Sequence, residues 1–202
     1  MDIKVLNLNK CFNGQQVLKN VSMTFKSGSI TCIMGASGIG KTTLANIMMG
    51  LQRADSGKIE GLKGKKISAV FQEDRLIEQW DAVKNIMLVC RKEFTQEYIH
   101  KNLNEIGLSD YEKKPVSSLS GGMRRRVAIV RALLLDYDVL IMDEPFKGLD
   151  YDLKKQVIGY VEKMTEGKTV IIITHDKDEV KMLKADLVIM NAEGSKADGK
   201  MQ

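Results

Sequence analysis

The sequence has 202 residues, of which 44% are hydrophobic and 28% are charged, and its net charge is +5. These values are typical of one soluble globular domain and exclude the disordered and fibrous classes of protein. The positive charge is too small and too dispersed to indicate nucleic-acid binding, and no apolar run approaches the roughly 18 residues that cross a bilayer.

The first part of the chain predicts a small antiparallel sheet and then a strand, a loop and a helix. Residues 3–8 and 17–25 alternate apolar and polar side chains, with a turn at Asn13-Gly14 between them. Residues 29–34 form an apolar strand that leads into a glycine-rich stretch, and apolar residues at helical spacing follow Lys41. Another strand is predicted at 67–71.

The rest of the chain predicts helices and then strands alternating with helices. Amphipathic helices are expected between 73 and 113, and one more from Gly121 to Leu135. Short apolar strands are expected at 139–142, 170–173 and 187–190, with a helix over about 152–164. This alternation is typical of a parallel α/β sheet that is covered on both faces.

We therefore expect a single domain over residues 1–202. Its core is expected at about 1–72 and 137–190, a helical subdomain at about 73–136, and a fraying polar tail at 191–202. Because the chain ends soon after the last predicted strand, no additional C-terminal regulatory domain is expected.

The strongest motif lies where a predicted strand passes into a predicted helix. It reads Gly35-Ala36-Ser37-Gly38-Ile39-Gly40-Lys41-Thr42 and has the spacing of a phosphate-binding P-loop. There the backbone N–H groups and the positive end of the helix dipole can surround phosphate oxygens. Lys41 would bind the β- and γ-phosphates, and the Thr42 hydroxyl would hold Mg²⁺. The alternative is a glycine-rich structural turn.

A second motif is a pair of carboxylates at the end of the apolar strand 139–142. Asp143 and Glu144 fall at the edge of the sheet where open α/β proteins bind ligands. Asp143 would hold Mg²⁺ through its water shell, and Glu144 would act as general base for the attacking water. Helix capping before Pro145 could explain one of these acids but not both.

A third segment, Leu119-Ser120-Gly121-Gly122-Met123, begins the helix predicted from Gly121. A serine hydroxyl, glycine N–H groups and a helix N-terminus together form a second anion site. With these elements in place, the sequence resembles the ABC (ATP-binding cassette) ATPase family from about Ile3 to about Met190, because this segment looks like the family's signature sequence. The family's usual glutamine is replaced by Met123, which leaves Ser120 and Gly122 unchanged.

The resemblance implies an α/β fold of the P-loop NTPase (RecA-like) class, with an N-terminal antiparallel β subdomain and an inserted α-helical signalling subdomain. It also implies a role for His175, which matches a switch histidine that contacts the γ-phosphate. A solvated residue at a strand end would be the ordinary interpretation of a lone histidine. Its distance along the chain from Glu144 fits one helix and one strand and favours the switch.

The remaining family positions also match. Gln72 corresponds to a glutamine that touches Mg²⁺ and the attacking water, and Gly148-Leu149-Asp150 resembles a loop that crosses the dimer interface. The implied catalytic residues are Lys41, Gln72, Glu144 and His175, and the implied metal-binding residues are Thr42, Gln72 and Asp143. The signature residues that would act on the partner's nucleotide are Ser120, Gly121, Gly122 and Met123, and the interface residue is Asp150. The implied nucleotide-binding residues are Phe12, Val17, Gly35, Ala36, Ser37, Gly38, Ile39, Gly40, Lys41, Thr42 and Thr43. In this set Phe12 would stack on adenine with Val17 beside the base, although on its own Phe12 would be read as a core residue.

The resemblance further implies ATP and Mg²⁺ as ligands and a dimer, homomeric or pseudo-symmetric, with two ATP molecules at its interface. We expect separate transmembrane permease subunits, an extracytoplasmic solute-binding protein in an import system, no nucleic-acid partner, and a location on the cytoplasmic face of the membrane. The lack of disulfide or zinc spacing among Cys11, Cys32 and Cys90 also favours the cytosol.

Residues 71–80, 123–128 and 144–150 are similar to importer ATPases of the bacterial nitrate, sulfonate, taurine and thiamine-precursor group. We therefore expect an importer of a small solute. The alternatives are an exporter or lipoprotein-releasing ATPase and a regulatory ATPase that binds a membrane protein without transport.

Several other residues carry structural expectations. Leu76, Ile77 and Trp80 are expected to form a surface groove for a permease helix. His100 is expected on the surface, and the run 124–126 is expected to be surface charge and interface contact. Four methionines are expected to fill the core: Met48, Met49, Met87 and Met164.

Overall fold

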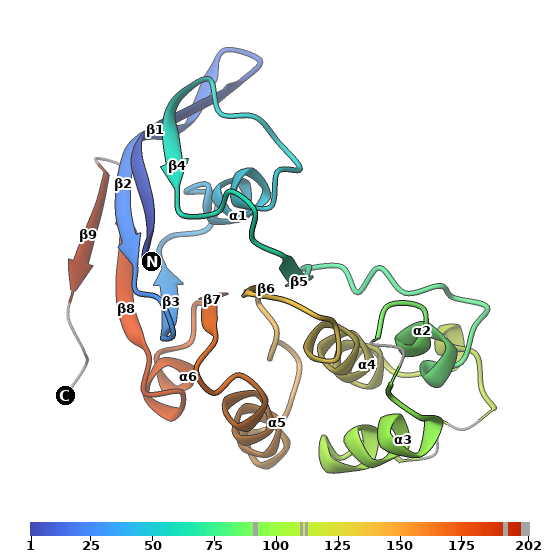
Figure 1. Cartoon of the computed structure of the whole chain (residues 1–202). Helices are drawn as coiled ribbons and strands as arrows, with labels where there is room; N and C mark the ends of the chain where they lie inside the picture. The colour runs from blue at the N-terminus through green and yellow to red at the C-terminus, as the bar shows by residue number, and fades with distance from the viewer. Residues whose placement is uncertain (91–92, 110, 112, 192–193, 199–202) are drawn as a thin grey trace.

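The computed structural model describes residues 1–90, 93–109, 111, 113–191 and 194–198. Figure 1 shows strands gathered in the left part of the molecule and helices below and to the right. The elements in chain order are β1 (Ile3–Phe12), β2 (Gln15–Phe25), β3 (Ile30–Met34), α1 (Lys41–Met48), β4 (Ser56–Glu60), β5 (Ile67–Val70), α2 (Ala82–Met87), α3 (Gln96–Glu105), the 3-10 turn η1 (Val116–Ser118), α4 (Gly121–Leu133), β6 (Val139–Asp143), α5 (Tyr151–Met164), β7 (Thr169–Ile173), α6 (Lys177–Met182), β8 (Asp186–Asn191) and β9 (Gly194–Asp198).

The N-terminal strands form the predicted antiparallel sheet, in the order β2-β1-β4. The turn between β1 and β2 has positive φ at both Asn13 (48°) and Gly14 (81°), as a two-residue hairpin turn requires. The sequence did not predict β4. Its residues are exposed or half-buried, so it lacks the apolar pattern that marks a strand.

The second sheet has the order β5-β6-β7-β3-β8-β9, with parallel pairing from β5 to β8. The prediction of a fraying tail is wrong for Gly194–Asp198, because β9 pairs antiparallel with β8. Pairing of this kind relies on backbone N–H and C=O groups and needs no apolar pattern in the sequence. The helix α6 was also not predicted.

Alternate residues of the parallel strands face two different apolar clusters. Cys32, Leu140 and Ile172 pack with the helices α4, α5 and α6. Ile33 and Ile141 pack on the other face with α1 and the antiparallel sheet. This alternation follows from the period of two along a strand, and it explains why the predicted strands are continuously apolar. Figure 1 shows α1 on one side of the sheet and α4, α5 and α6 on the other.

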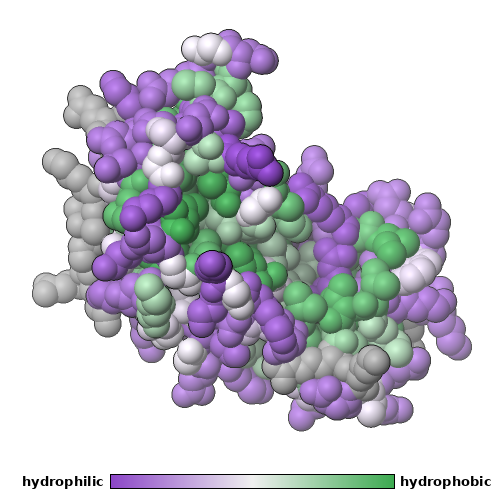
Figure 2. Space-filling view, turned by 45° about the horizontal axis from the view of Figure 1, so that its top comes forward, coloured by the Kyte–Doolittle hydropathy of each residue, from purple (hydrophilic) through white to green (hydrophobic). Residues whose placement is uncertain are grey.

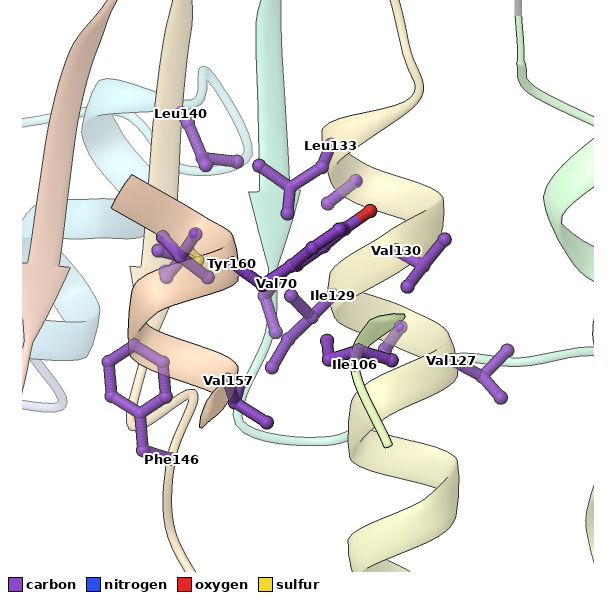
Figure 3. Packing of buried hydrophobic residues seen from close by; sticks show 14 of the residues in the cluster. Val70, Ile106, Val127, Ile129, Val130, Leu133, Leu140, Phe146, Val157 and Tyr160 are labelled. Carbon is purple, nitrogen blue, oxygen red and sulfur yellow. The ribbon is translucent and has the colours of Figure 1, made fainter. Parts of the chain in front are cut away.

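The segment between β5 and β6 carries the predicted helices and joins the core through α4. Figure 3 shows Val127 and Ile129 of α4 close to Ile106, with Tyr160 of α5 beside them. The Tyr160 hydroxyl donates to Asn102 Oδ1 at 2.7 Å, so the packing of α5 on α3 includes a satisfied buried polar pair.

The structure corrects three expectations about this segment. Arg125 and Arg126 are buried, at 7% and 8% exposure, and not on the surface, because their guanidinium groups donate to backbone carbonyls. His100 is half-buried, and its Nδ1 lies 2.7 Å from the Tyr111 hydroxyl. Met87 is exposed, whereas Met48 is buried as predicted.

Among the residues that the structure describes, no helix combines the length and the apolar character of a membrane span.

Candidate active site

The loop between β3 and α1 has a backbone that only glycine allows at two points. Gly40, the N-cap of α1, has φ of 99°, and a Cβ there would lie 2.6 Å from Leu18 Cδ2. A Cβ on Gly35 would lie 2.5 Å from the carbonyl oxygen of Met190. The loop is therefore held tightly against β2 and β8, with the N-terminus of α1 open to a ligand.

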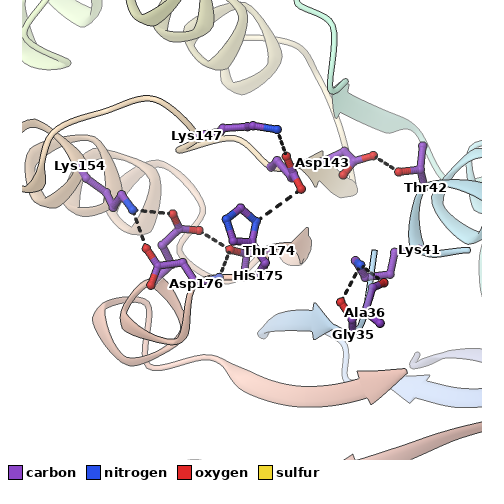
Figure 4. A network of polar contacts seen from close by, with 12 residues as sticks. Gly35, Ala36, Lys41, Thr42, Asp143, Lys147, Lys154, Thr174, His175 and Asp176 are labelled. Carbon is purple, nitrogen blue, oxygen red and sulfur yellow. Dashed lines mark hydrogen bonds and ion pairs between the residues drawn. The ribbon is translucent and has the colours of Figure 1, made fainter. Parts of the chain in front are cut away.

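Lys41 and Thr42 follow directly in the first turn of α1. The Lys41 ammonium donates to the carbonyls of Gly35 and Ala36 at 2.8 and 2.9 Å, so it lies over the loop (Figure 4). The Thr42 hydroxyl donates to Asp143 Oδ2 at 2.7 Å. These two side chains place a cation and a hydroxyl beside the loop and the N-terminus of α1.

Asp143 ends β6 and is 6% exposed. Its burial raises the pKa of the carboxyl; the Thr42 hydrogen bond opposes this rise and the charge of Glu144 adds to it. Thr42, Asp143 and Gln72, whose side chains all carry oxygen, line one cleft. A few hard oxygen ligands, with phosphate and water supplying the rest, suit Mg²⁺, so these residues fit the implied metal.

Glu144 turns away from the line of β6 because its backbone has φ of 47°, which is rare for a residue other than glycine. Its N–H still donates to the carbonyl of Ile173, which anchors the turn on β7. Its Oε2 accepts from Lys147 Nζ at 2.9 Å, and its Oε1 lies 3.5 Å from His175 Nδ1. The lysine hydrogen bond is the main reason that the pKa of Glu144 is lowered, so Glu144 is ionised at neutral pH.

His175 follows β7, and a group of polar contacts anchors the residues next to it. Glu179 is 4% exposed and accepts from the Thr174 hydroxyl and from Lys154 Nζ, which is 2.9 Å from its Oε1. Lys154 also donates to Asp176 Oδ2 at 2.6 Å. Figure 4 shows this group directly beside His175. The residues on both sides of the histidine are thus tied to α5 and α6.

These segments together line a cleft of about 410 Å³. The structure brings the following predicted site residues to its wall: Val17, Gly35, Ser37, Gly38, Gly40, Lys41, Thr42, Thr43, Gln72, Asp143, Glu144 and His175. A phosphate-binding loop, a carboxylate pair and a histidine therefore surround one space, from segments that lie far apart in the sequence.

The other predicted site residues lie outside the lining of this cleft. Phe12, at the end of β1, is 39% exposed, and the Lys10 ammonium lies 5.2 Å from its ring centroid. Ser120 is the N-cap of α4, where its hydroxyl accepts from Met123 N at 3.3 Å. Asp150 caps α5 in the same way by accepting from Leu153 N. Ser120 and Asp150 are both exposed, so another molecule can reach them.

The sequence analysis missed Lys147, Lys154 and Glu179. Only Lys147, three positions after Glu144, had a signal in the sequence, since that spacing permits a local ion pair. Lys154 lies in α5 and meets Glu179 only after the chain returns through β7. Its role depends on tertiary structure.

Comparison with known proteins gives a consistent result. A family profile described as ABC transporter matches residues 18–147. The spermidine/putrescine import ATP-binding protein PotA of Fusobacterium nucleatum is 32% identical over 95% of this chain and 55% of its own length. The sulfate/thiosulfate import ATP-binding protein CysA of Synechococcus elongatus is 34% identical over 94% of this chain and 60% of its own length. The chain thus spans little more than half of these relatives.

Two solved structures of the ATP-binding cassette MJ0796 match the whole fold. Each has a TM-score of 0.86 and 26% identity, and the match covers 99% of both chains. One is described as the dimeric structure of a post-hydrolysis state bound to ADP and Pi. The predicted α/β fold with a P-loop NTPase core is thereby confirmed.

Proposed function

The chain belongs to the ABC transporter family, and from that premise we propose that it binds ATP in the cleft, hydrolyses it, and drives a membrane permease that is a separate protein. The observation that carries this proposal is the cleft itself. It joins Lys41 and Thr42 of the loop to Asp143, Glu144 and His175 at the ends of β6 and β7.

The chemistry follows from the residues around the cleft. N–H groups of the loop and of the first turn of α1 hold the phosphate oxygens, and Lys41 turns from its carbonyl contacts to the β- and γ-phosphates. Glu144 takes a proton from a water molecule as the water oxygen attacks the γ-phosphorus. The bond from that phosphorus to the β,γ-bridging oxygen breaks, which leaves ADP and phosphate.

Mg²⁺, when bound, would neutralise charge on the phosphate oxygens. Thr42, Asp143 and Gln72, which line the cleft together, would hold it. His175, with its Nδ1 directed to Glu144, leaves its other ring nitrogen for the γ-phosphate.

We propose a dimer as the working state. Ser120 and the N–H groups of Gly121 and Gly122 form an anion site at the start of α4, next to Met123, and this site lies outside the chain's own cleft. A second subunit would bring its nucleotide to this site, with Asp150 near the interface. The description of the MJ0796 structures as dimeric supports this arrangement for a related fold.

The permease contact is proposed on the lobe that carries α2 and α3. Trp80, Met87 and Leu88 are 38%, 44% and 57% exposed, and Figure 2 shows apolar surface on this lobe. The groove predicted from Leu76, Ile77 and Trp80 needs correction, since Leu76 is buried at 8% exposure and Ile77 is half-buried. We propose Trp80 and the exposed face of α2 instead. Such an association would place the chain on the cytoplasmic face of the membrane.

Import of a small solute is the direction we propose, with an extracytoplasmic solute-binding protein as a further component. The names of the PotA and CysA relatives, which describe import of spermidine/putrescine and of sulfate/thiosulfate, support it. The likeness to the nitrate, sulfonate, taurine and thiamine-precursor group stays a proposal, because these relatives are named for other solutes.

The experiment is affinity purification of tagged Glu144→Gln protein from detergent-solubilised membranes with ATP, followed by mass spectrometry. Co-purification of a polytopic permease is expected, and the partner's sequence would distinguish importer from exporter or lipoprotein-releasing complex. If the complex of the two proteins hydrolyses ATP in vesicles but moves no solute, the chain would instead be a regulatory ATPase. Recovery of soluble proteins alone would contradict the transport role.

A further inference from the structure

We propose that Arg125 is a positioning residue for Gln72, which it holds through the backbone on both sides. Arg125 Nη1 donates to the carbonyl of Phe71, and Nη2 donates to the carbonyl of Gln72. These carbonyls belong to the two peptide units that flank the Cα of Gln72. One planar guanidinium therefore fixes both backbone torsions of that residue.

The surroundings of Arg125 favour this single arrangement. Its side chain is 9% exposed, and the Asp74 carboxylate lies 3.3 Å from Nη1, which compensates the buried charge. The two terminal nitrogens of the rigid fork suit two neighbouring carbonyls at once, while the Asp74 carboxylate supplies the opposite charge. Burial removes the competing water, so the guanidinium has no equally good alternative position.

Arg131, six residues further along α4, contacts the same loop at a different point. It donates to the carbonyls of Asp74 and Arg75 at 2.9 and 2.8 Å. These peptide units lie beyond Gln72, so Arg131 secures the loop without fixing the torsions of Gln72. The pair provides a test residue and a matched control that share helix, chemistry and target loop.

The position of Gln72 gives this contact its consequence. Gln72 lines the main cleft and also a neighbouring hollow of about 180 Å³, in both cases together with Thr42 and Asp143. Arg125 is also in the helix that Ser120 begins, about 7.5 Å further along its axis. Arg125 thus connects the start of α4 to the edge of the cleft through one side chain.

The inference rests on the proposed role of Gln72 at the metal and the attacking water. The test uses Arg125→Lys in the full chain, because lysine keeps the charge but lacks the planar fork whose two terminal nitrogens reach the two carbonyls separately. Arg125→Gln is the second variant in case the first does not fold, and Arg131→Lys is the control. Circular dichroism and thermal melting establish that each variant is folded.

Two quantities are measured. Turnover gives kcat and KM for ATP, and calorimetry in a Glu144→Gln background gives ATP affinity with Mg²⁺ and with EDTA. For Arg125→Lys we expect kcat to fall about 10- to 100-fold, the range found when supporting contacts of a metal site are lost. The gain in ATP affinity from Mg²⁺ should shrink, while affinity in EDTA stays the same. Arg131→Lys should keep both quantities close to those of the parent protein.

A double mutant separates this inference from the proposed function. In a Gln72→Ala background, Arg125→Lys should lower kcat no further, because the residue it positions is gone. If Gln72→Ala lowers activity but Arg125→Lys does not, or if the two effects multiply, the positioning role is wrong and the role of Gln72 stands. If Gln72→Ala leaves both kcat and the Mg²⁺ effect unchanged, the role of Gln72 is wrong and the inference falls with it.

Discussion

The hydroxyl of Thr42 and the carboxylate of Asp143 are joined by a hydrogen bond of 2.7 Å, although 101 positions separate the two residues. The bond connects the first turn of α1 to the end of β6. It places two oxygen atoms of different segments at the point where a nucleotide-bound Mg²⁺ would lie.

Replacement of Asp143 by asparagine should stabilise the fold and impair binding. Burial raises the pKa of Asp143, so its charged form costs free energy in the folded state, and this cost grows as pH rises through the folded-state pKa. In EDTA, the melting temperature of Asp143→Asn relative to the parent should therefore be higher at pH 8 than at pH 4. The exposed Asp152→Asn, measured in the same way, is the control. An equal difference between Asp143→Asn and the parent at both pH values would contradict the argument.

Replacement of Glu144 by glutamine should remove hydrolysis and keep ATP binding. The amide cannot accept the proton of water, and loss of a general base costs about 100-fold or more in kcat. The loop around Lys41 is unchanged, so nucleotide affinity should persist, and size-exclusion chromatography with ATP should show a trapped dimer. Glu166→Gln, at an exposed position after α5, is the control. Undiminished turnover in Glu144→Gln would rule out this base.

Replacement of Lys147 by methionine should shift the pH dependence of turnover. The lysine is the main cause of the lowered pKa of Glu144, so its loss raises that pKa toward the ordinary value. The acidic limb of kcat/KM against pH, which requires ionised Glu144, should then move to higher pH. Turnover measured through the acidic range below pH 5 and up to neutral pH checks this. A limb that stays in place would mean that another group titrates.

Replacement of Lys154 by methionine should destabilise the fold. It leaves the buried Glu179 carboxylate without its ammonium partner, and a hydrogen bond to a charged group contributes about 2 kcal/mol. Lys163 of the same helix pairs with Glu105 at an exposed site, so Lys163→Met should cost less than about 1 kcal/mol. Urea denaturation gives both values. Equal losses would show that the Glu179 contact is no stronger than a surface pair.

The sequence predicted those parts of the molecule that depend on local pattern. The loop at Gly35 and the buried strand before Asp143 have short-range signals, because each motif needs its residue types at fixed spacing. Side chains such as Arg125 and Lys154 have no such signal. Charged residues in a sequence indicate surface by default, and only the folded chain brings the carbonyl of Gln72 or the carboxylate of Glu179 within their reach.

Two strands escaped prediction for a related reason. β4 and β9 are held in their sheets by backbone pairing with β1 and β8, and their sequences carry no run of apolar residues. The prediction for Leu76 was wrong in the opposite sense, because it placed a buried residue on the surface. In sequence alone, an apolar residue after a strand fits a surface groove and a buried contact equally well.

The order of strands in the second sheet determines how far apart three residues of the site lie. Asp143 is the last residue of β6, and Gln72 and His175 follow the carboxyl ends of β5 and β7, which lie on either side of β6 in the sheet. Their separation is set by the spacing of strands, about 4.8 Å, and not by the length of chain between them. The distance between these strand ends therefore stays the same however many residues the intervening chain contains.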